Sequence, residues 1–149
     1  MNRVLLDAPL GEAHGKRLVT LAKRFLKKLE LDGVELSLAL VDNRTIRRLN
    51  RQWRGKDKPT DVLSFPGGDH VGPGLRPLGD IIISFTTAKT AAREFDSTLE
   101  NELQLYLAHG LLHLLGHDHH TPREARAMQK REQFLLGSDG MLSRSDEVD

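Results

Sequence analysis

Residues 109–120 read H-G-L-L-H-L-L-G-H-D-H-H and contain five of the chain's seven histidines. His109 and His113 are four residues apart in an apolar run that predicts a helix, so their imidazoles lie on one helix face. Gly116 is typical of a helix end, because glycine adopts the left-handed conformation at little cost. The chain can then turn back and bring His119 to the same place.

Three imidazoles without a thiolate are typical of a metal site that keeps one coordination position open, as catalytic zinc sites do. We therefore expect one Zn²⁺ per chain, bound by His109, His113 and His119. Imidazole ligands also suit nickel, copper and iron, so the identity of the metal stays open. Asp118 has two interpretations, either as an acceptor for a ligand ring N–H or as an ordinary loop residue. We expect His117 and His120 to be solvent-exposed or to lie just behind the ligands.

The spacing H-x-x-x-H-x-x-G-x-x-H is also that of the metzincin zinc proteases, with one departure. Those proteases place their general base, a glutamate, directly after the first histidine, where this chain has Gly110. Peptide hydrolysis must protonate an amine leaving group, and loss of such an acid or base typically costs about 10²–10⁴ in rate. A metalloprotease is therefore a weak alternative. A binding module with a structural metal is another, although structural zinc sites usually contain thiolates.

The composition limits the class of protein. A chain of 149 residues suits one domain, and the absence of cysteine excludes disulfide scaffolds and fits a reducing compartment. The N-terminus lacks the apolar length of a signal peptide, and no stretch is long enough to span a membrane. We therefore expect a cytoplasmic protein without a membrane partner. A net charge of +1 argues neither for nor against nucleic-acid binding.

Hydrophobic periodicity predicts an α+β fold, a single layered domain over residues 1–137 in which a small mixed sheet packs with helices. Strands are predicted at 4–6, 34–40, 61–65 and 80–84, and helices at 11–31, from 43 to about 53, at 86–95, from 98 through the first two histidines, and at 122–136. Helix caps are predicted at Asp42 or Asn43, at Ser97 with Glu100, and at Thr121 with Glu124. The Gly- and Pro-rich segment 66–78 predicts a mobile loop, and the polar tail 138–149 predicts disorder.

The predicted helix that follows residue 42 carries an unbalanced set of positive charges. Its buried stripe is predicted from Ile46, Leu49 and Trp53, and four arginines recur at i, i+3, i+4 and i+7 on another face. These arginines are Arg44, Arg47, Arg48 and Arg51. Surface helices usually interleave charges of both signs, yet no acidic residue occurs between Arg44 and Lys56. A solvated helix face is the alternative interpretation.

The positive charges continue through Arg54, Lys56 and Lys58 into a predicted polar loop at 55–59. Guanidinium groups bind phosphate oxygens in bidentate pairs, and unbalanced positive charge attracts nucleic-acid backbones. We therefore expect RNA phosphates to contact the four helix arginines and Lys56. The chain has one Trp, one Tyr and five Phe, so extensive base stacking is not indicated.

Several separated segments together resemble the YbeY family of bacterial metal-dependent endoribonucleases. The segment H-G-L-L-H-L-L-G-H-D-H is similar to the family signature H-G-x-L-H-L-x-G-Y-D-H. The resemblance extends to W-R-G-K-D-K-P-T-D-V-L-S-F-P at 53–66, to L-G-D-I-I-I-S at 78–84, and to Glu124, Met128 and Glu132 of the last helix. His117 departs from the family's usual Tyr, and it lies too close to His119 in sequence to serve as a fourth ligand.

The resemblance implies an α+β fold, zinc on the three histidines, and an essential arginine at Arg54. It also implies single-stranded RNA as substrate, a role in ribosomal RNA processing and ribosome maturation, and the ribosome or small-subunit assembly factors as partners. A zinc-bound hydroxide would attack an RNA phosphodiester, since zinc lowers the pKa of its bound water to roughly 7. Arg54 would stabilise the charge that develops on the phosphate. The cleavage site and the oligomeric state stay open.

Overall fold

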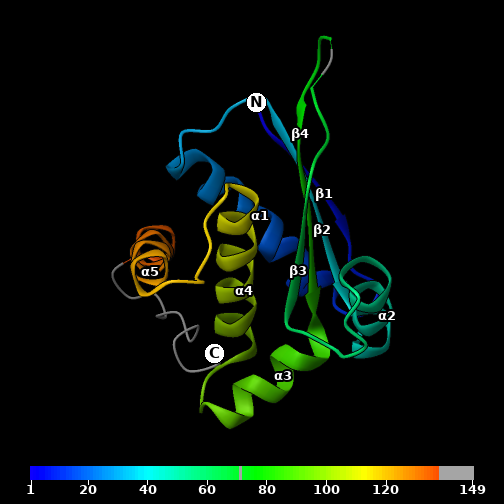
Figure 1. Ribbon diagram of the computed structural model, residues 1–149. Helices are drawn as coiled ribbons and strands as arrows, with labels where there is room; N and C mark the ends of the chain where they lie inside the picture. The colour runs from blue at the N-terminus through cyan, green and yellow to red at the C-terminus, as the bar shows by residue number, and fades with distance from the viewer. Residues whose placement is uncertain (71, 138–149) are drawn as a thin grey trace.

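The computed structural model describes residues 1–70 and 72–137 (Figure 1). Its strands are β1 (Arg3–Asp7), β2 (Val34–Val41), β3 (Val62–Pro66) and β4 (Arg76–Ser84). Its helices are α1 (Glu12–Lys28), α2 (Asn43–Arg54), α3 (Phe85–Glu94), α4 (Leu99–Leu114) and α5 (Pro122–Leu136). These elements confirm the predicted α+β class. The tail at 138–149 lies outside the described residues.

The four strands form one mixed sheet in the order β1-β2-β4-β3. β1 and β4 pair parallel to β2, whereas β3 pairs antiparallel to β4 and forms one edge. β4 begins at Arg76, four residues before the predicted start at Asp80, because its first residues pair with the beginning of β2 in the register Val34↔Arg76. Pairing with β2 thus extends the strand into part of the segment that its glycines and prolines had predicted to be a loop.

The main core lies between one face of the sheet and helices α1 and α4. The alternation predicted for β2 is confirmed, since Val34, Leu36, Leu38 and Leu40 are all buried. They belong to one apolar cluster with residues of both helices, such as Phe25. Figure 1 shows α5 packed on the outer side of α4, away from the sheet. Helix α4 is therefore enclosed between the sheet and α5, which holds its histidines in a fixed frame.

Helix α2 lies apart from α1, α4 and α5 and packs beside β4 (Figure 1). Its buried stripe begins as predicted with Ile46, which is fully buried, and continues with Asn50. Trp53 was predicted to belong to this stripe, and that prediction is wrong, because its side chain is 63% exposed. The last turn of α2 lies against the edge strand β3, where Phe65 contacts the indole while much of its surface stays open.

The helix caps mostly follow the sequence. Asp42 accepts a hydrogen bond from the backbone N–H of Thr45, and Thr121 accepts one from that of Glu124. The cap predicted at Ser97 is wrong: Thr98 caps α4 by accepting from the backbone N–H of Asn101. The N–H of Ser97 donates to the carbonyl of Ala92, so Ser97 still belongs to the turn that closes α3.

Smaller boundary differences accompany these. Helix α1 ends at Lys28 rather than at residue 31, and α3 begins at Phe85, one residue before the prediction, with Ser84 as its cap. Within the described residues, no helix is both long and apolar enough to cross a membrane.

Candidate metal centre and adjoining pocket

The end of helix α4 is built to return the chain toward its own histidines. Gly116 has a φ of +92°, and its N–H donates to the carbonyl of His113 at 3.0 Å. The N–H of His117 donates to the carbonyl of Leu112 at 3.0 Å. This pair of bonds is the Schellman arrangement, which satisfies the last helical carbonyls while the chain reverses direction. The predicted role of Gly116 is thereby confirmed.

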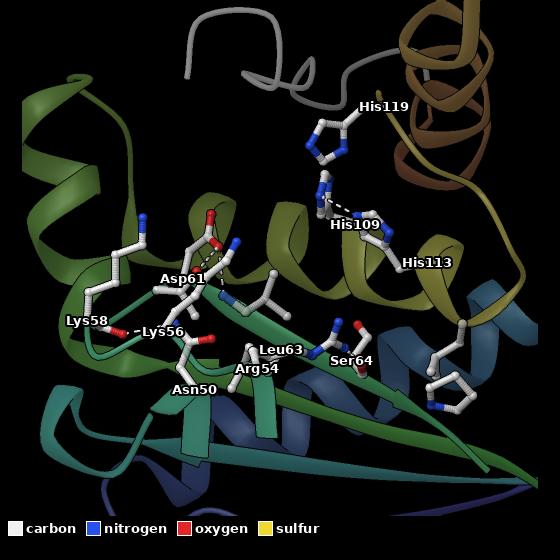
Figure 2. A pocket seen from close by; sticks show the side chains of 14 residues that line it. Asn50, Arg54, Lys56, Lys58, Asp61, Leu63, Ser64, His109, His113 and His119 are labelled. Carbon is white, nitrogen blue, oxygen red and sulfur yellow. Dashed lines mark hydrogen bonds between the residues drawn. The ribbon is translucent and has the colours of Figure 1, made fainter. Parts of the chain in front are cut away.

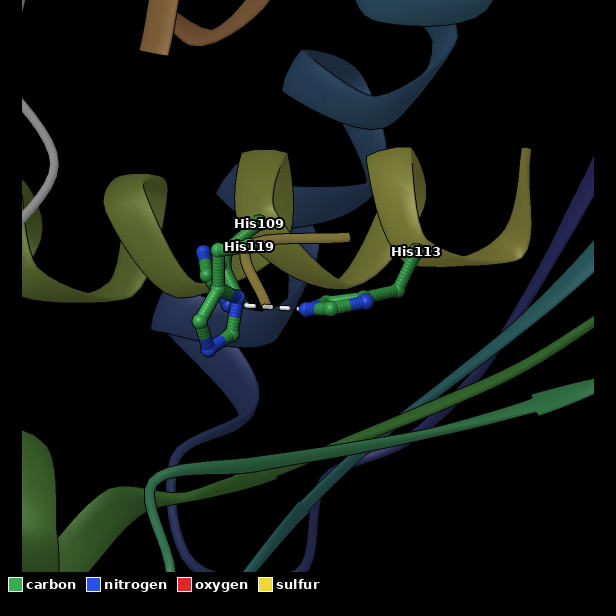
Figure 3. A group of neighbouring side chains, drawn as sticks. All are labelled: His109, His113 and His119. Carbon is green, nitrogen blue, oxygen red and sulfur yellow. Dashed lines mark hydrogen bonds between the residues drawn. The ribbon is translucent and has the colours of Figure 1, made fainter. Parts of the chain in front are cut away.

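The reversal brings His119 next to the two helical histidines (Figure 3). The Nε2 atoms of His109 and His113 are 3.0 Å apart, and the His119 ring centroid lies 5.5 Å from the centroid of each. One ligand nitrogen from each residue falls within 4.8 Å of the other two. Three ring nitrogens that converge in this way fit a single divalent cation, and imidazoles are good ligands for zinc and its first-row neighbours.

The protonation state of His113 also suits a ligand. Burial, with a further contribution from the neighbouring His109 and His119 rings, lowers the pKa of His113 to about 4. Its imidazole is therefore neutral at pH 7, and the neutral ring is the form that binds metals.

Gly110 occupies a place where the structure leaves no space for a side chain. A Cβ added there would lie 2.8 Å from the Cγ2 of Ile81 and 3.1 Å from the Oγ of Ser64. The Ser64 hydroxyl donates to the Gly110 carbonyl at 3.0 Å, so helix and sheet are in close contact at this residue. The position that holds the metzincin glutamate thus packs against the sheet. The absence of a protease base here follows from helix–sheet packing.

A carboxylate on α5 lies behind the first histidine. Glu132 is fully buried, and one of its oxygens lies 3.7 Å from Nδ1 of His109. Neither carboxylate oxygen has a hydrogen-bond partner among the described residues. The ring is thus flanked by Glu132 on its Nδ1 side and by His113 on its Nε2 side. In the sequence, Glu132 stood out solely as part of the family resemblance, because periodicity does not show which helix will face α4.

The remaining polar residues of the segment 117–120 shape the loop. Asp118 accepts a hydrogen bond from the backbone N–H of His119 at 2.8 Å, and its other oxygen pairs with the His120 ring at 2.9 Å. The first bond fixes the backbone of the residue that carries the third imidazole. His120 is exposed, as predicted, and His117 is half-buried.

The three histidines line a pocket of about 580 Å³ between α4 and the edge strand (Figure 2). Across the pocket are the cationic residues Arg54, Lys56 and Lys58, with Asp61 nearby. Asn50 is buried beneath them, and its side-chain amide donates to the carbonyl of Lys58 at 2.9 Å. This bond holds the loop at 55–60 against α2. One cavity therefore combines three imidazoles with three cationic side chains.

Arg54 is held in place although its side chain is exposed. It is the last residue of α2, one residue beyond the predicted end of the helix, and Gly55 ends the helix with a φ of +70°. Its Nη2 donates to the carbonyl of Ser64 at 2.6 Å, and its guanidinium carbon lies 5.3 Å from the centre of the Phe65 ring. These two contacts direct the guanidinium toward β3 and the pocket.

The four arginines of the predicted basic face are all exposed on α2, but none is among the described residues that line the pocket. Arg47 pairs with Asp57 at 2.9 Å. Asp57 lies just beyond the stretch that lacks acidic residues, so the loop partly neutralises this face. The role predicted for Arg44, Arg48 and Arg51 in binding phosphate stays a prediction, whereas Lys56 does lie in the pocket.

Comparison with known proteins agrees with this geometry. The family model described as Endoribonuclease YbeY matches residues 10–139. An Endoribonuclease YbeY of Myxococcus xanthus is 59% identical across 99% of this chain and 52% of its own length. An Endoribonuclease YbeY of a Sulfurihydrogenibium species is 47% identical across 83% of this chain and 82% of its own length.

The fold has a counterpart among solved structures. A solution structure of a Thermotoga maritima protein superposes with a TM-score of 0.60 at 31% identity, covering 93% of this chain and 91% of that one. The chain spans about half the length of its Myxococcus relative and about 72% of the length of an Anaeromyxobacter relative. The match of the family model over most of the chain, the identity to its relatives and the three converging histidines lead to one conclusion: this chain belongs to the Endoribonuclease YbeY family.

Proposed function

We propose that this protein is a metal-dependent endoribonuclease that hydrolyses phosphodiester bonds of single-stranded ribosomal RNA. The observation that carries the proposal is the pocket in which His109, His113 and His119 face Arg54, Lys56 and Lys58. Hydrolysis of a phosphodiester needs a nucleophile that attacks the phosphorus atom. It also needs positive groups that neutralise the charge on the phosphate oxygens. The two kinds of side chain that line the pocket match these two needs.

In this scheme, the side chains of the protein bind the RNA backbone and stabilise the charge that develops on the phosphate. A bound divalent metal, which we take to be zinc, would supply a coordinated water of lowered pKa and thus a nucleophile at neutral pH. Lys56 and Lys58 attract the RNA backbone into the pocket and hold its phosphate. A guanidinium has five N–H donors, so Arg54 can keep its bond to Ser64 and still donate to the phosphate oxygens. Because its position is already fixed, Arg54 stabilises developing negative charge without reorganisation.

The two alternatives fit the site less well. A metalloprotease would need an acid or base for its amine leaving group, and the close contact of Gly110 with the sheet leaves no space for one at the metzincin position. A purely structural metal would be enclosed by four ligands, whereas the three histidines line a pocket that reaches the surface. An accessible metal site therefore favours a catalytic role over a purely structural one.

The cellular setting belongs to the proposal. The family resemblance of the sequence implies a role in ribosomal RNA processing and ribosome maturation. We place this protein in the same process, in the cytoplasm, with the ribosome or small-subunit assembly factors as partners. The complete absence of cysteine fits a reducing compartment.

The proposal is tested by incubating metal-loaded protein with single-stranded RNA, duplex RNA and casein, and analysing the products. We expect internal cleavage of the single strand, little cleavage of the duplex and none of casein. His113→Ala should abolish cleavage, whereas His120→Ala should retain it, because His120 is an exposed histidine next to the site that makes one surface ion pair. Casein digestion would favour the protease. Retained cleavage in His113→Ala would contradict the proposal.

A further inference from the structure

A pair of aromatic side chains lies beside the pocket and has no part in the mechanism described above. The indole of Trp53 and the ring of Phe65 meet edge to face, with centroids 6.3 Å apart and planes at 65°. The Trp53 side chain is nevertheless 63% exposed, which leaves much of its ring surface open to solvent. Exposing an apolar indole surface to water is unfavourable in free energy. An exposed indole that packs against a neighbouring ring is therefore a suitable place for a flat ligand to stack.

Both residues of the aromatic pair are neighbours in sequence of residues that line the pocket. Arg54, directly after Trp53, lines the pocket, and so do Ser64 and Pro66 on either side of Phe65. Side chains alternate along a strand, and Val62 and Ser64 point toward α4. Phe65 therefore points to the opposite side of β3, toward α2. The aromatic pair thus lies around the edge of the sheet from the pocket, with the Arg54 guanidinium between them.

The charges around the pair indicate what kind of ligand it would bind. The guanidinium of Arg54 lies over the other ring of the pair, 5.3 Å from the Phe65 centroid. Lys56, three residues after Trp53, lines the adjoining pocket. A flat apolar ring beside a guanidinium, next to a cationic pocket, suits a ligand that alternates flat rings with negative charges. A single nucleic-acid strand has that pattern, and its unpaired bases stack on aromatic side chains.

We propose that the exposed face of Trp53 stacks an unpaired nucleobase of the RNA strand whose phosphate occupies the pocket. This inference rests on the proposed function for the identity of the strand as RNA. β3 is the edge strand of the sheet, so the strand can cross it and place a neighbouring nucleotide on Trp53. Bases in a duplex are stacked on one another and are not free to reach the indole. The aromatic pair would therefore select single strands.

The first test uses Trp53 as its own reporter, because it is the sole tryptophan in the sequence. Labelled single-stranded RNA, an oligonucleotide of the same length with abasic sites, and duplex RNA are titrated into His113→Ala, which the proposed function expects not to cleave. Anisotropy of the label measures binding, and indole emission measures stacking. We expect the single strand to quench emission, and the abasic strand to bind more weakly with little quenching. Equal quenching by both strands, or binding of RNA with unchanged emission, would overturn the inference.

The second test compares matched variants. Trp53→Ala should weaken binding of single-stranded RNA by roughly 5- to 150-fold, the range measured when stacking side chains are removed, and Trp53→Phe should restore most of it. Phe134→Ala is the control. Phe134 is likewise an exposed aromatic residue, at 48%, and lies beneath Arg131, but it belongs to α5 and does not line the pocket. Melting temperature and metal content should be unchanged in all three. Unaltered affinity in Trp53→Ala would overturn the inference and leave the indole as a surface for a protein partner.

The two proposals fail in different ways. If RNA is cleaved but binding neither changes the Trp53 emission nor depends on the Trp53 side chain, the stacking proposal is wrong and the proposed endoribonuclease activity is retained. If single-stranded RNA quenches Trp53 in a base-dependent way but the metal-loaded protein does not cleave it, the stacking site stands and the proposed activity is wrong. Absence of any RNA binding would overturn both.

Discussion

Among single residues, Glu132 and Arg54 show how neighbouring groups prepare the site. Glu132 is a fully buried carboxylate 3.7 Å from Nδ1 of His109, and neither of its oxygens has a hydrogen-bond partner in the described part of the chain. Carboxylates in this position orient a ligating imidazole and raise its basicity. Arg54 is fixed in a comparable way by the Ser64 carbonyl and the Phe65 ring. The two side chains are thus held in defined positions beside the histidines and the pocket.

Glu132→Gln should weaken metal binding by about 10- to 100-fold, because the amide keeps the size of the side chain but loses its negative charge toward His109. Competition with a chelator of known affinity measures the change without reference to activity. Glu124→Gln on the exposed side of the same helix is the control and should bind metal normally. Equal affinity in the two variants would show that Glu132 does not assist His109.

Arg54→Lys should reduce single-turnover cleavage by about 10²–10³ and reduce RNA affinity far less. Lysine keeps the positive charge, but it cannot bond the Ser64 carbonyl, stack on Phe65 and present a planar pair of donors at once. Cleavage and binding are measured on the same preparation, together with its melting curve. Losses of equal size in both would make Arg54 an anchoring residue rather than one that acts in the transition state.

Among the elements, the sequence predicted best where one periodic pattern dominates. The four-residue spacing of the histidines and the position of Gly116 correctly predicted a helix end that brings a third imidazole back. The early start of β4 was missed because pairing with β2 overrides local glycine and proline signals. The exposure of Trp53 was missed because helical periodicity does not tell where a helix passes the edge of its sheet. Those two errors depend on tertiary packing.

Gly110→Ala tests the contact between α4 and the sheet. The added methyl would press on Ile81 and Ser64, and overpacking of this kind costs about 1–3 kcal/mol, partly offset by up to about 1 kcal/mol of helix propensity. Urea unfolding should therefore show a net loss of stability. Gly68→Ala is the control, since a Cβ there meets open space, and its stability should change by less than about 0.5 kcal/mol. A Gly110→Ala protein as stable as the control would show that the packing here is loose.

Helix α2 allows a test of its basic face. The double variant Arg48→Glu, Arg51→Glu should weaken RNA binding and make it less dependent on salt. The slope of log K against log salt concentration should become shallower by about 0.7 for each phosphate that the variant no longer neutralises. Arg47 is a poorer choice because it already pairs with Asp57. Metal content should not change, as neither arginine lines the pocket. An unchanged slope would identify these arginines as a solvated helix face.

In the molecule as a whole, the mixed sheet and α4 form a frame that brings distant segments to one pocket. The histidines come from α4 and the loop after it, and the cations come from the end of α2 and its following loop. The convergence of the three histidines could be predicted from the sequence because they lie within eleven residues of one another. The opposing wall could not be derived from periodicity, because residues 54–58 and 109–119 are far apart in the sequence and line one pocket only through the tertiary fold. The family resemblance supplied Arg54.

The central claim is that one metal, held by three histidines, works on RNA held by the cations across the same pocket. The most direct measurement removes the metal with a chelator, restores it stepwise, and follows both bound metal and cleavage of single-stranded RNA in the wild type and in His113→Ala. We predict that cleavage rises in parallel with metal and saturates at about one metal per chain, and that His113→Ala recovers neither. Cleavage that persists without metal, or full metal binding by His113→Ala, would contradict the account.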